Sequence, residues 1–310
     1  MAERARMSQE IYTLIPILAM VSGLALPDIF LPFSRLSAVL VAGIFFITAL
    51  KMDLQGVFKE FKDMRLLALE TSIMLVIFPI VTYLIAATFF NSLAVPLMLL
   101  AAMPAGMSSP LLTDLVGGRK NLAVVLTLLT SILAPLTIPL VIQILVGSQV
   151  SLNYISMFTS LSIVVVMPLV LAQIVLRTTP QLVKKTSWLH RPLSVVMLSL
   201  IIGGAVADQS IPILTSIGTG DAWTILMVLF VCFILFFVVG YIAPRWRSHG
   251  DRLASAICLA YMNFSLAIYI AEIYFPQEKV LVPLALSVLP WTLTFIPFYL
   301  LSKIDSQRKR

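Results

Sequence analysis

With 60% hydrophobic and only 11% charged residues among its 310, the chain is too apolar for a soluble globular protein, in which about 25% of residues are charged. The formal net charge of +7 does not predict a nucleic-acid partner, because the basic residues lie in alternate loops, a pattern typical of membrane topology. The two cysteines fall in apolar segments and the two histidines in polar loops, so we expect neither a disulfide framework nor a metal site.

Apolar runs follow one another along the whole chain and predict an all-α polytopic membrane protein. The expected spans are ten, at residues 11–26, 37–52, 66–89, 94–116, 122–147, 152–176, 192–207, 222–243, 253–275 and 280–302. The first run has no small-residue cleavage site after it, so we interpret it as a span and not as a signal peptide.

The loop charges support this count. With the N-terminus inside, the inner segments hold 19 of the 21 Lys and Arg residues, and the outer loops hold only Arg35 and Lys279. Positive charge accumulates on the cytoplasmic side of such proteins. The sequence therefore predicts a multi-pass protein of the cell (inner) membrane with both termini in the cytoplasm.

Ten spans divide into two five-helix repeats, residues 1–150 and 151–310, within one membrane domain. An odd number of spans per repeat inverts the second half, as in many secondary transporters, whose sites lie at the repeat interface. Span four then corresponds to span nine. A faint match supports this pairing, with MSSPL at 107–111 and MNFSL at 262–266.

The stretch 99–114 (LLAAMPAGMSSPLLTD) predicts an interrupted helix in span four. Pro104 removes a backbone donor, while Ser109 and Pro110 together are typical of a helix N-cap followed by proline at the first helical position. In span nine the interruption is inferred only from polar Asn263 and Ser265, because no Pro or Gly occurs there. Broken backbone at membrane depth is tolerated inside protein or beside a wet cavity.

Where the two broken spans cross, we expect a polar pocket without fixed charge, into which half-helix N-termini point. The candidate substrate-binding residues are Gly106, Met107, Ser108, Ser109, Pro110, Asn263 and Ser265. The alternative is that polar side chains join packed helices, as they do in any membrane bundle. We favour binding for Ser109 and Asn263, and helix packing for Thr130 and Ser131.

Acidic residues inside spans are costly and often functional. Glu70 and Asp114 are expected to reach the inner interface or to pair with neighbouring basic residues such as Arg65 and Lys120, and Glu272 is expected to reach the outer interface. No charged residue occupies a midplane position, which disfavours a central proton relay and leaves proton coupling through Glu70 or Asp114 open. No catalytic motif is present, so we do not expect an enzyme.

Several segments resemble the bile acid:sodium symporter family of the bile/arsenite/riboflavin transporter superfamily, over nearly the whole chain. The resemblance is carried by PAGMSS at 104–109, Thr127 and Pro135, MPLVL at 167–171, LIIGGAV at 200–206, and Asn263. It implies ten helices in two inverted five-helix repeats, core and panel domains, and crossed broken helices four and nine.

Carried over by position, the resemblance implies that Ser109 and Thr127 are sodium-binding hydroxyl residues and that Asn263 contacts substrate. The ion-site positions also include Cys258 and Met262, where the family has Glu and Gln, and the family's Asn is Pro110 here. Hard cations require oxygen ligands, so most of both sodium sites is missing. Sodium is therefore implied by the family and disfavoured by these residues.

We accordingly expect a secondary active transporter of a small organic anion or amphipath, working by alternating access as a monomer in the lipid bilayer, with no other cofactor. The alternative is a transport-inactive membrane sensor or assembly partner that retains the carrier fold. Missing ion ligands and the apolar Met107, Cys258 and Met262 favour this second interpretation.

Overall fold

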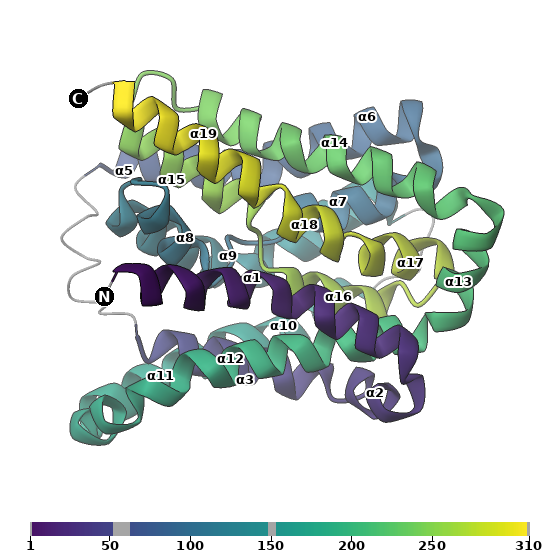
Figure 1. Ribbon diagram of the computed structural model, residues 1–310, viewed down its shortest axis with the longest axis horizontal. Coiled ribbons are helices and arrows are strands. Elements are labelled where there is room, and N and C mark those ends of the chain that lie inside the picture. The colour runs from purple at the N-terminus through teal and green to yellow at the C-terminus, as the bar shows by residue number, and fades with distance from the viewer. Residues whose placement is uncertain (1, 52–62, 148–152, 309–310) are drawn as a thin grey trace.

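The computed structural model describes residues 2–51, 63–147 and 153–308, and these are almost entirely helical (Figure 1). Within those ranges, six helices are long and apolar enough to cross a membrane, or seven if the bent pair α1 and α2 is one span. Several shorter apolar helices accompany them. The polytopic helical class is therefore confirmed, whereas the count of ten spans stays a prediction.

Three of the long helices are continuous: α9 (Lys120–Val146), α12 (Pro180–Asp208) and α14 (Asp221–Ile242). The expected span 192–207 is only the second half of α12, so its predicted short length was wrong. The polar residues 184–191 lower the hydropathy of the first half, yet nothing in them stops a helix, and α12 continues through Pro192. Hydropathy locates the apolar part of a helix and not its ends.

Two long helices contain a π-helical turn that ends two residues before a proline. One runs through α5 (Met64–Ser72), the turn Ile73–Ile77 and α6 (Phe78–Phe89). The other runs through α10 (Tyr154–Leu161), the turn Ser162–Val166 and α11 (Met167–Thr178). Pro79 and Pro168 lack an N–H and crowd the preceding turn, and a π turn is one way a helix accommodates this.

The last span is divided into α17 (Glu278–Leu286), α18 (Val288–Leu293) and α19 (Phe295–Arg308). The short connecting helices are Asn91–Leu93, a single 3₁₀ turn, and α13 (Ser210–Thr219). In Figure 1, α1 begins and α19 ends at the same left-hand end of the molecule, and α13 lies at the opposite end. This arrangement is consistent with an even number of crossings.

One group of helices surrounds α12 and is called the α12 group here: α1 (Ala2–Ala25), α2 (Pro27–Ser34), α3 (Ser37–Ala49) and α11. It forms the lower part of Figure 1. A Cβ atom added at Gly23 would lie 2.5 Å from the carbonyl oxygen of Gly203, so α1 approaches α12 this closely because residue 23 is glycine. Small residues allow such contacts between membrane helices.

A second group, called the α9 group, contains α5, α6, α7 (Ala94–Ala102), α8 (Ser109–Leu115) and α9 together with α14 and α15 (His249–Ala260). Here α14 packs on α15, α6 on α7, and both α8 and α15 on α9. Three helices outside these groups lie between them. The helix α10 packs on α9, α18 packs on α1, and α16 (Phe264–Tyr274) packs on α3 and α12. The interrupted helices described below belong mainly to the α9 group.

The outer side of α14 shows how the molecule meets its surroundings. Trp223, Met227 and Val231 are all more than half exposed and recur every four residues, so they form one apolar stripe along the helix. In water such a stripe would be an aggregation hazard, whereas lipid chains solvate it well. The exposed apolar side chains thus support an integral membrane protein.

Candidate functional site

Two helices are interrupted, as the sequence predicts, and three of their four halves belong to the α9 group. In the first, α7 (Ala94–Ala102) ends before Pro104 and α8 (Ser109–Leu115) follows. In the second, α15 ends at Ala260 and α16 begins at Phe264, although no Pro or Gly separates them. Each interruption leaves helix-terminal N–H and C=O groups that require partners at membrane depth.

The two interruptions supply partners for each other. Ala105 and Met262 form an isolated antiparallel bridge. The Gly106 N–H donates to the Tyr261 carbonyl at 2.8 Å, and the Asn263 N–H donates to the Pro104 carbonyl at 2.8 Å. We call this paired segment, residues 103–108 with 261–263, the crossing. It joins the two half-helix pairs through backbone groups that would otherwise be unsatisfied.

Gly106 permits this close approach. A Cβ atom at this position would lie 2.5 Å from the Tyr261 oxygen and 2.9 Å from the Met262 oxygen, both of them backbone atoms. Any side chain would therefore push the two segments apart. The role of Gly106 seen here is steric, and a contact with substrate at this residue stays a prediction.

Thr130 on α9 is a further part of the crossing. Its hydroxyl oxygen accepts a hydrogen bond from the Ala105 N–H at 3.1 Å while the hydroxyl donates to the Leu126 carbonyl at 2.6 Å. The sequence analysis favours helix packing for Thr130, and these contacts are of that kind, since the hydroxyl joins α9 to a backbone donor of the interruption. A threonine that bonds its own helix four residues back still has a lone pair free, which the sequence alone does not reveal.

The start of α8 differs by one residue from the prediction. Ser108 is the N-cap and Pro110 is the second helical residue, so the prediction of Ser109 as N-cap with proline at the first position was wrong. The Ser109 hydroxyl donates to the Tyr261 carbonyl at 2.9 Å. Ser109 is the first helical residue, and its hydroxyl links the two interruptions and does not cap α8.

Asn263 caps α16 with its side chain. Its Oδ1 accepts from the Leu266 N–H at 3.2 Å and from the Ser265 hydroxyl at 2.8 Å. Its Nδ2 is buried without a hydrogen-bond partner in the described part of the chain. The sequence match noted above aligns Ser108 with Asn263, and the structure gives both residues the same place, the N-cap of the second half-helix.

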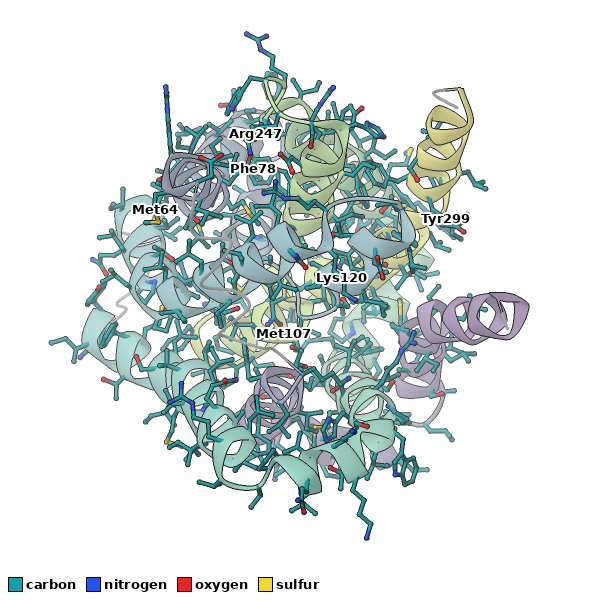
Figure 2. The ribbon with its side chains drawn as sticks, turned by 90° about the vertical axis from the view of Figure 1, so that its left-hand side faces the viewer. Met64, Phe78, Met107, Lys120, Arg247 and Tyr299 are labelled. Atoms are coloured by element: carbon teal, nitrogen blue, oxygen red, sulfur yellow. The ribbon has the colours of Figure 1, made fainter. Side chains whose placement is uncertain are left out.

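The crossing is mostly closed. Ser109, Met262, Asn263 and Ser265 are buried, whereas Met107 is half-buried and Ser108 is exposed. Figure 2 places Met107 near the middle of the molecule, where the α9 and α12 groups face each other. We expected a wet pocket around all seven predicted residues. Of these residues, only Met107 and Ser108 are accessible from outside, so the crossing can be reached only past them.

A cavity of about 420 Å³, open to the outside along Ile132, Val170 and Ile174, lies between α3, α9 and α11. Its lining is almost wholly apolar and comprises Ala49, Leu128, Ile132, Val166, Leu169, Val170, Gln173, Ile174 and Arg177. Gln173 is engaged with the Ala49 carbonyl at 3.0 Å. The cavity therefore combines an apolar wall with one cationic side chain, at a place where the α12 and α9 groups meet.

Aromatic rings close the crossing on the side of α18. The Trp291 ring lies 4.9 Å from the Tyr261 ring and 5.0 Å from the Phe264 ring, measured between centroids, and is stacked on the latter. Offset aromatic packing of this kind fixes neighbouring backbone. The sequence analysis missed Trp291, whose only signal was a tryptophan next to a proline in the last apolar run.

The residues at the family's sodium positions do not fit a hard cation. Cys258 is fully buried, with its Sγ 4.0 Å from the Ala123 carbonyl, and the Thr127 hydroxyl faces this thiol. Ser109 already donates to Tyr261, and Met262 is a buried thioether. A thiol in place of a carboxylate supplies neither the charge nor the oxygen that sodium requires, so we derive no step through a sodium ion.

The acidic residues divide into three cases. Asp114 lies 3.7 Å from the Lys120 ammonium, as expected. The expectation for Glu70 was wrong, because it is 1% exposed and accepts from the Ser255 hydroxyl at 2.6 Å. The expectation for Glu272 was also wrong, because both its carboxylate oxygens are buried. Neighbouring helices cover these two side chains, which hydropathy cannot anticipate.

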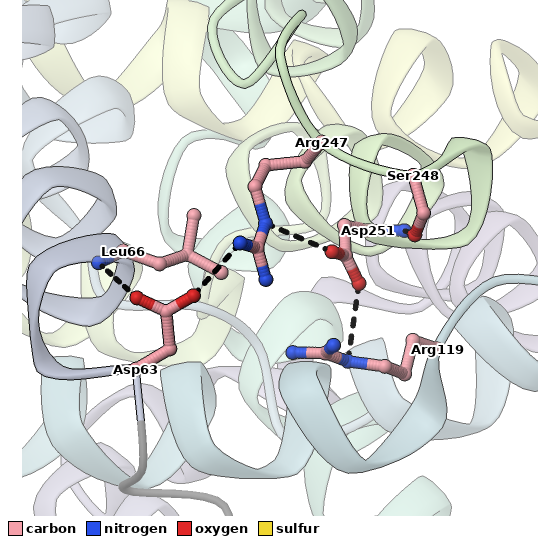
Figure 3. A network of polar contacts seen from close by, with 6 residues as sticks. All are labelled: Asp63, Leu66, Arg119, Arg247, Ser248 and Asp251. Atoms are coloured by element: carbon pink, nitrogen blue, oxygen red, sulfur yellow. Dashed lines mark hydrogen bonds and ion pairs between the residues drawn. The ribbon is translucent and has the colours of Figure 1, made fainter.

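An ion network holds the end of the α9 group that is predicted to face the cytoplasm (Figure 3). The buried Asp251 carboxylate binds Arg119 and Arg247, each at 3.1 Å, and Arg247 reaches Asp63 at 2.8 Å. Asp63 in turn accepts from the Leu66 N–H at 3.1 Å and caps α5. The starts of α5, α9 and α15 are thereby tied together.

Taken together, the helical bundle, its lipid-compatible surface and the paired interruptions define a polytopic membrane protein of the transporter type. A family model agrees: the SBF-like CPA transporter family matches residues 11–296. The chain belongs to this family, and the resemblance to bile acid:sodium symporters is confirmed. No curated protein sequence matches the chain. A transporter family is consistent with a non-enzymatic protein and favours a carrier over a sensor.

Proposed function

We propose that this protein is a secondary carrier that moves a small organic anion or amphipath across the cell membrane by alternating access, as a monomer. The observation that supports it most strongly is the crossing, where two interrupted helices satisfy each other's backbone groups. Interrupted helices that meet within a bundle are the usual sites of secondary transporters.

The proposed architecture has ten membrane-spanning helices in two inverted five-helix repeats. In it, α7 with α8 and α15 with α16 are equivalent broken helices. The shared N-cap positions of Ser108 and Asn263 support this equivalence. The α12 group and the α9 group would then be the panel and core domains, and relative movement of the two would expose the crossing to either side in turn.

An anionic substrate group would be bound by hydrogen-bond donors and not by a fixed charge. Asn263 Nδ2 is the donor best suited to this role, since it is buried at the crossing and unused within the described residues. Ser108 and Met107 are the residues through which a substrate would approach it. The apolar cavity between α3, α9 and α11, with Arg177 in its lining, suits the hydrophobic body and negative charge of an amphipath.

We test this function with the full-length protein in liposomes, measuring uptake of a labelled bile acid as an amphipathic anion and of lactate as a small one. Uptake of at least one above that of empty liposomes is expected, and it should persist when potassium replaces sodium. Uptake that requires a sodium gradient would contradict the absence of sodium sites. Binding of the probes without counterflow would contradict transport.

The site is tested by Asn263→Ala against a matched control. Asn153→Ala removes an equivalent N-cap bond, from the Ser156 N–H at 3.1 Å, at an exposed helix start far from the crossing in sequence. Losing one substrate hydrogen bond weakens binding by about tenfold. We expect this change in KM for Asn263→Ala and none for Asn153→Ala. Equal KM values in folded variants would remove Asn263 from the site.

A further inference from the structure

Glu70 is a carboxylate buried inside a helix long and apolar enough to cross a membrane. Its Oε2 accepts from the Ser255 hydroxyl, whereas its Oε1 is buried without a hydrogen-bond partner among the described residues. A buried carboxylate is stable only if it is paired, fully hydrogen-bonded or neutralised. A single hydroxyl partner does not meet the first two conditions.

The ionisable groups facing Glu70 do not supply a counter-charge. Asp251 and the Cys258 thiol, both on α15, are the neighbours that interact with it electrostatically, and both are acidic. The cationic groups Arg119 and Arg247 at the inner end are bound to the Asp251 carboxylate, and no interaction of Glu70 with a cation appears among its electrostatic contacts in the described part of the chain. Among the described residues, no ion pair neutralises Glu70, so a proton is the cation that suits this position best.

The surroundings of Glu70 also connect it to the crossing. Ser255 lies on α15, and this half-helix ends at Ala260, directly before Tyr261, whose carbonyl accepts from both Gly106 and Ser109. On the other side, α5 passes three residues after Glu70 into the π-helical turn Ile73–Ile77. Such turns often occur at functional sites, where a helix changes its hydrogen-bond pattern. A change at Glu70 can therefore be transmitted through α15.

We propose that the Glu70 carboxylate binds and releases a proton during the transport cycle and that its bond to Ser255 conveys this change to the crossing. The inference rests on the proposed carrier function and names its coupling ion. The proton adds to the free oxygen Oε1, and the Ser255 hydroxyl keeps donating to Oε2. The structure favours Glu70 over Asp114 for this role, because the Asp114 side chain is 57% exposed and lies beside Lys120.

Infrared difference spectroscopy tests the proton site without a known substrate. Spectra of the full-length protein in liposomes are recorded at acid and alkaline pH. A buried carboxylic C=O band that grows towards acid pH is expected in the wild type. The component that belongs to Glu70 should disappear in Glu70→Gln, shift in frequency in Ser255→Ala, and persist unchanged in Asp114→Asn, while Glu272→Gln identifies the component of the other buried carboxyl group. An unchanged band in Glu70→Gln would overturn the proposal, whatever the result of the uptake assays.

Trp291 offers a second readout, at the crossing itself. In a background where Trp188, Trp223 and Trp246 are replaced by Phe, Trp291 is the remaining tryptophan and packs on Tyr261. Its fluorescence should respond to pH, and Glu70→Gln should abolish that response while Asp114→Asn preserves it. An identical pH response in Glu70→Gln would show that the crossing does not sense this carboxylate and would contradict the proposed coupling.

Discussion

The two interruptions have similar shapes and different causes. The first contains Pro104, Gly106 and Pro110, so its backbone is prevented from forming a continuous helix whatever surrounds it. The second, at Tyr261–Asn263, has no such residue and is held by a side-chain cap and by backbone bonds to the first. One break is therefore local in origin, and the other depends on its partner.

This difference predicts how the crossing responds to mutation. Residues that make contact between the two segments should matter more than residues that merely interrupt a helix. The four comparisons below run from the largest expected effect to the smallest, and each measures thermal unfolding of the purified protein in detergent.

Gly106→Ala should be the most harmful change. Its Cβ would meet two backbone oxygens, which cannot move without opening the bridge, and overpacking of this kind costs about 1–3 kcal/mol. Gly218→Ala is the control, because a Cβ there has no atom within 4 Å. It should be neutral or stabilising by about 0.4–1 kcal/mol. Equal unfolding temperatures for the two variants would contradict the close approach at Gly106.

Asn263→Ala and Ser108→Ala compare the two N-caps. Asn263 makes a side-chain cap bond and Ser108 makes none within the described structure, so we expect a loss of about 1–2 kcal/mol for the first and little change for the second. If both variants unfold alike, the second interruption does not depend on its cap.

Ser109→Ala should have an intermediate effect. It removes the hydroxyl that donates to the Tyr261 carbonyl, but this oxygen keeps the Gly106 N–H as a donor. Deleting one buried hydrogen bond while its acceptor stays satisfied costs about 0.5–1.5 kcal/mol. A loss as large as that of Gly106→Ala would show that Ser109 carries more of the crossing than these contacts indicate.

Pro104→Ala should cause a smaller loss of stability than Gly106→Ala, Asn263→Ala or Ser109→Ala. Its carbonyl, which accepts from Asn263, is present in alanine too, and the bridge keeps the segment extended. The remaining cost is the greater freedom of the unfolded chain, about 0.4–1 kcal/mol. A collapse of the fold in this variant would mean that the first interruption needs its proline after all.

The candidate site was predictable in part. Pro104 and Pro110 predicted the first interruption, and the polar residues Asn263 and Ser265 were the only local signs of the second. The contributions of Thr130 and Trp291 could not be predicted, since each comes from a helix remote in sequence whose orientation depends on packing. Glu70 was misjudged for the same reason, because hydropathy reports depth along one helix and not the cover provided by others.

By itself, the sequence determined the membrane class, the position of the apolar segments and the first interruption, because these follow from composition and from the backbone chemistry of proline. Only the tertiary structure decided which groups meet at the crossing and which carboxylate is buried. Those features depend on how α7, α9, α15 and α18 pack, and hydrogen bonds between segments more than a hundred residues apart leave no local pattern in the chain.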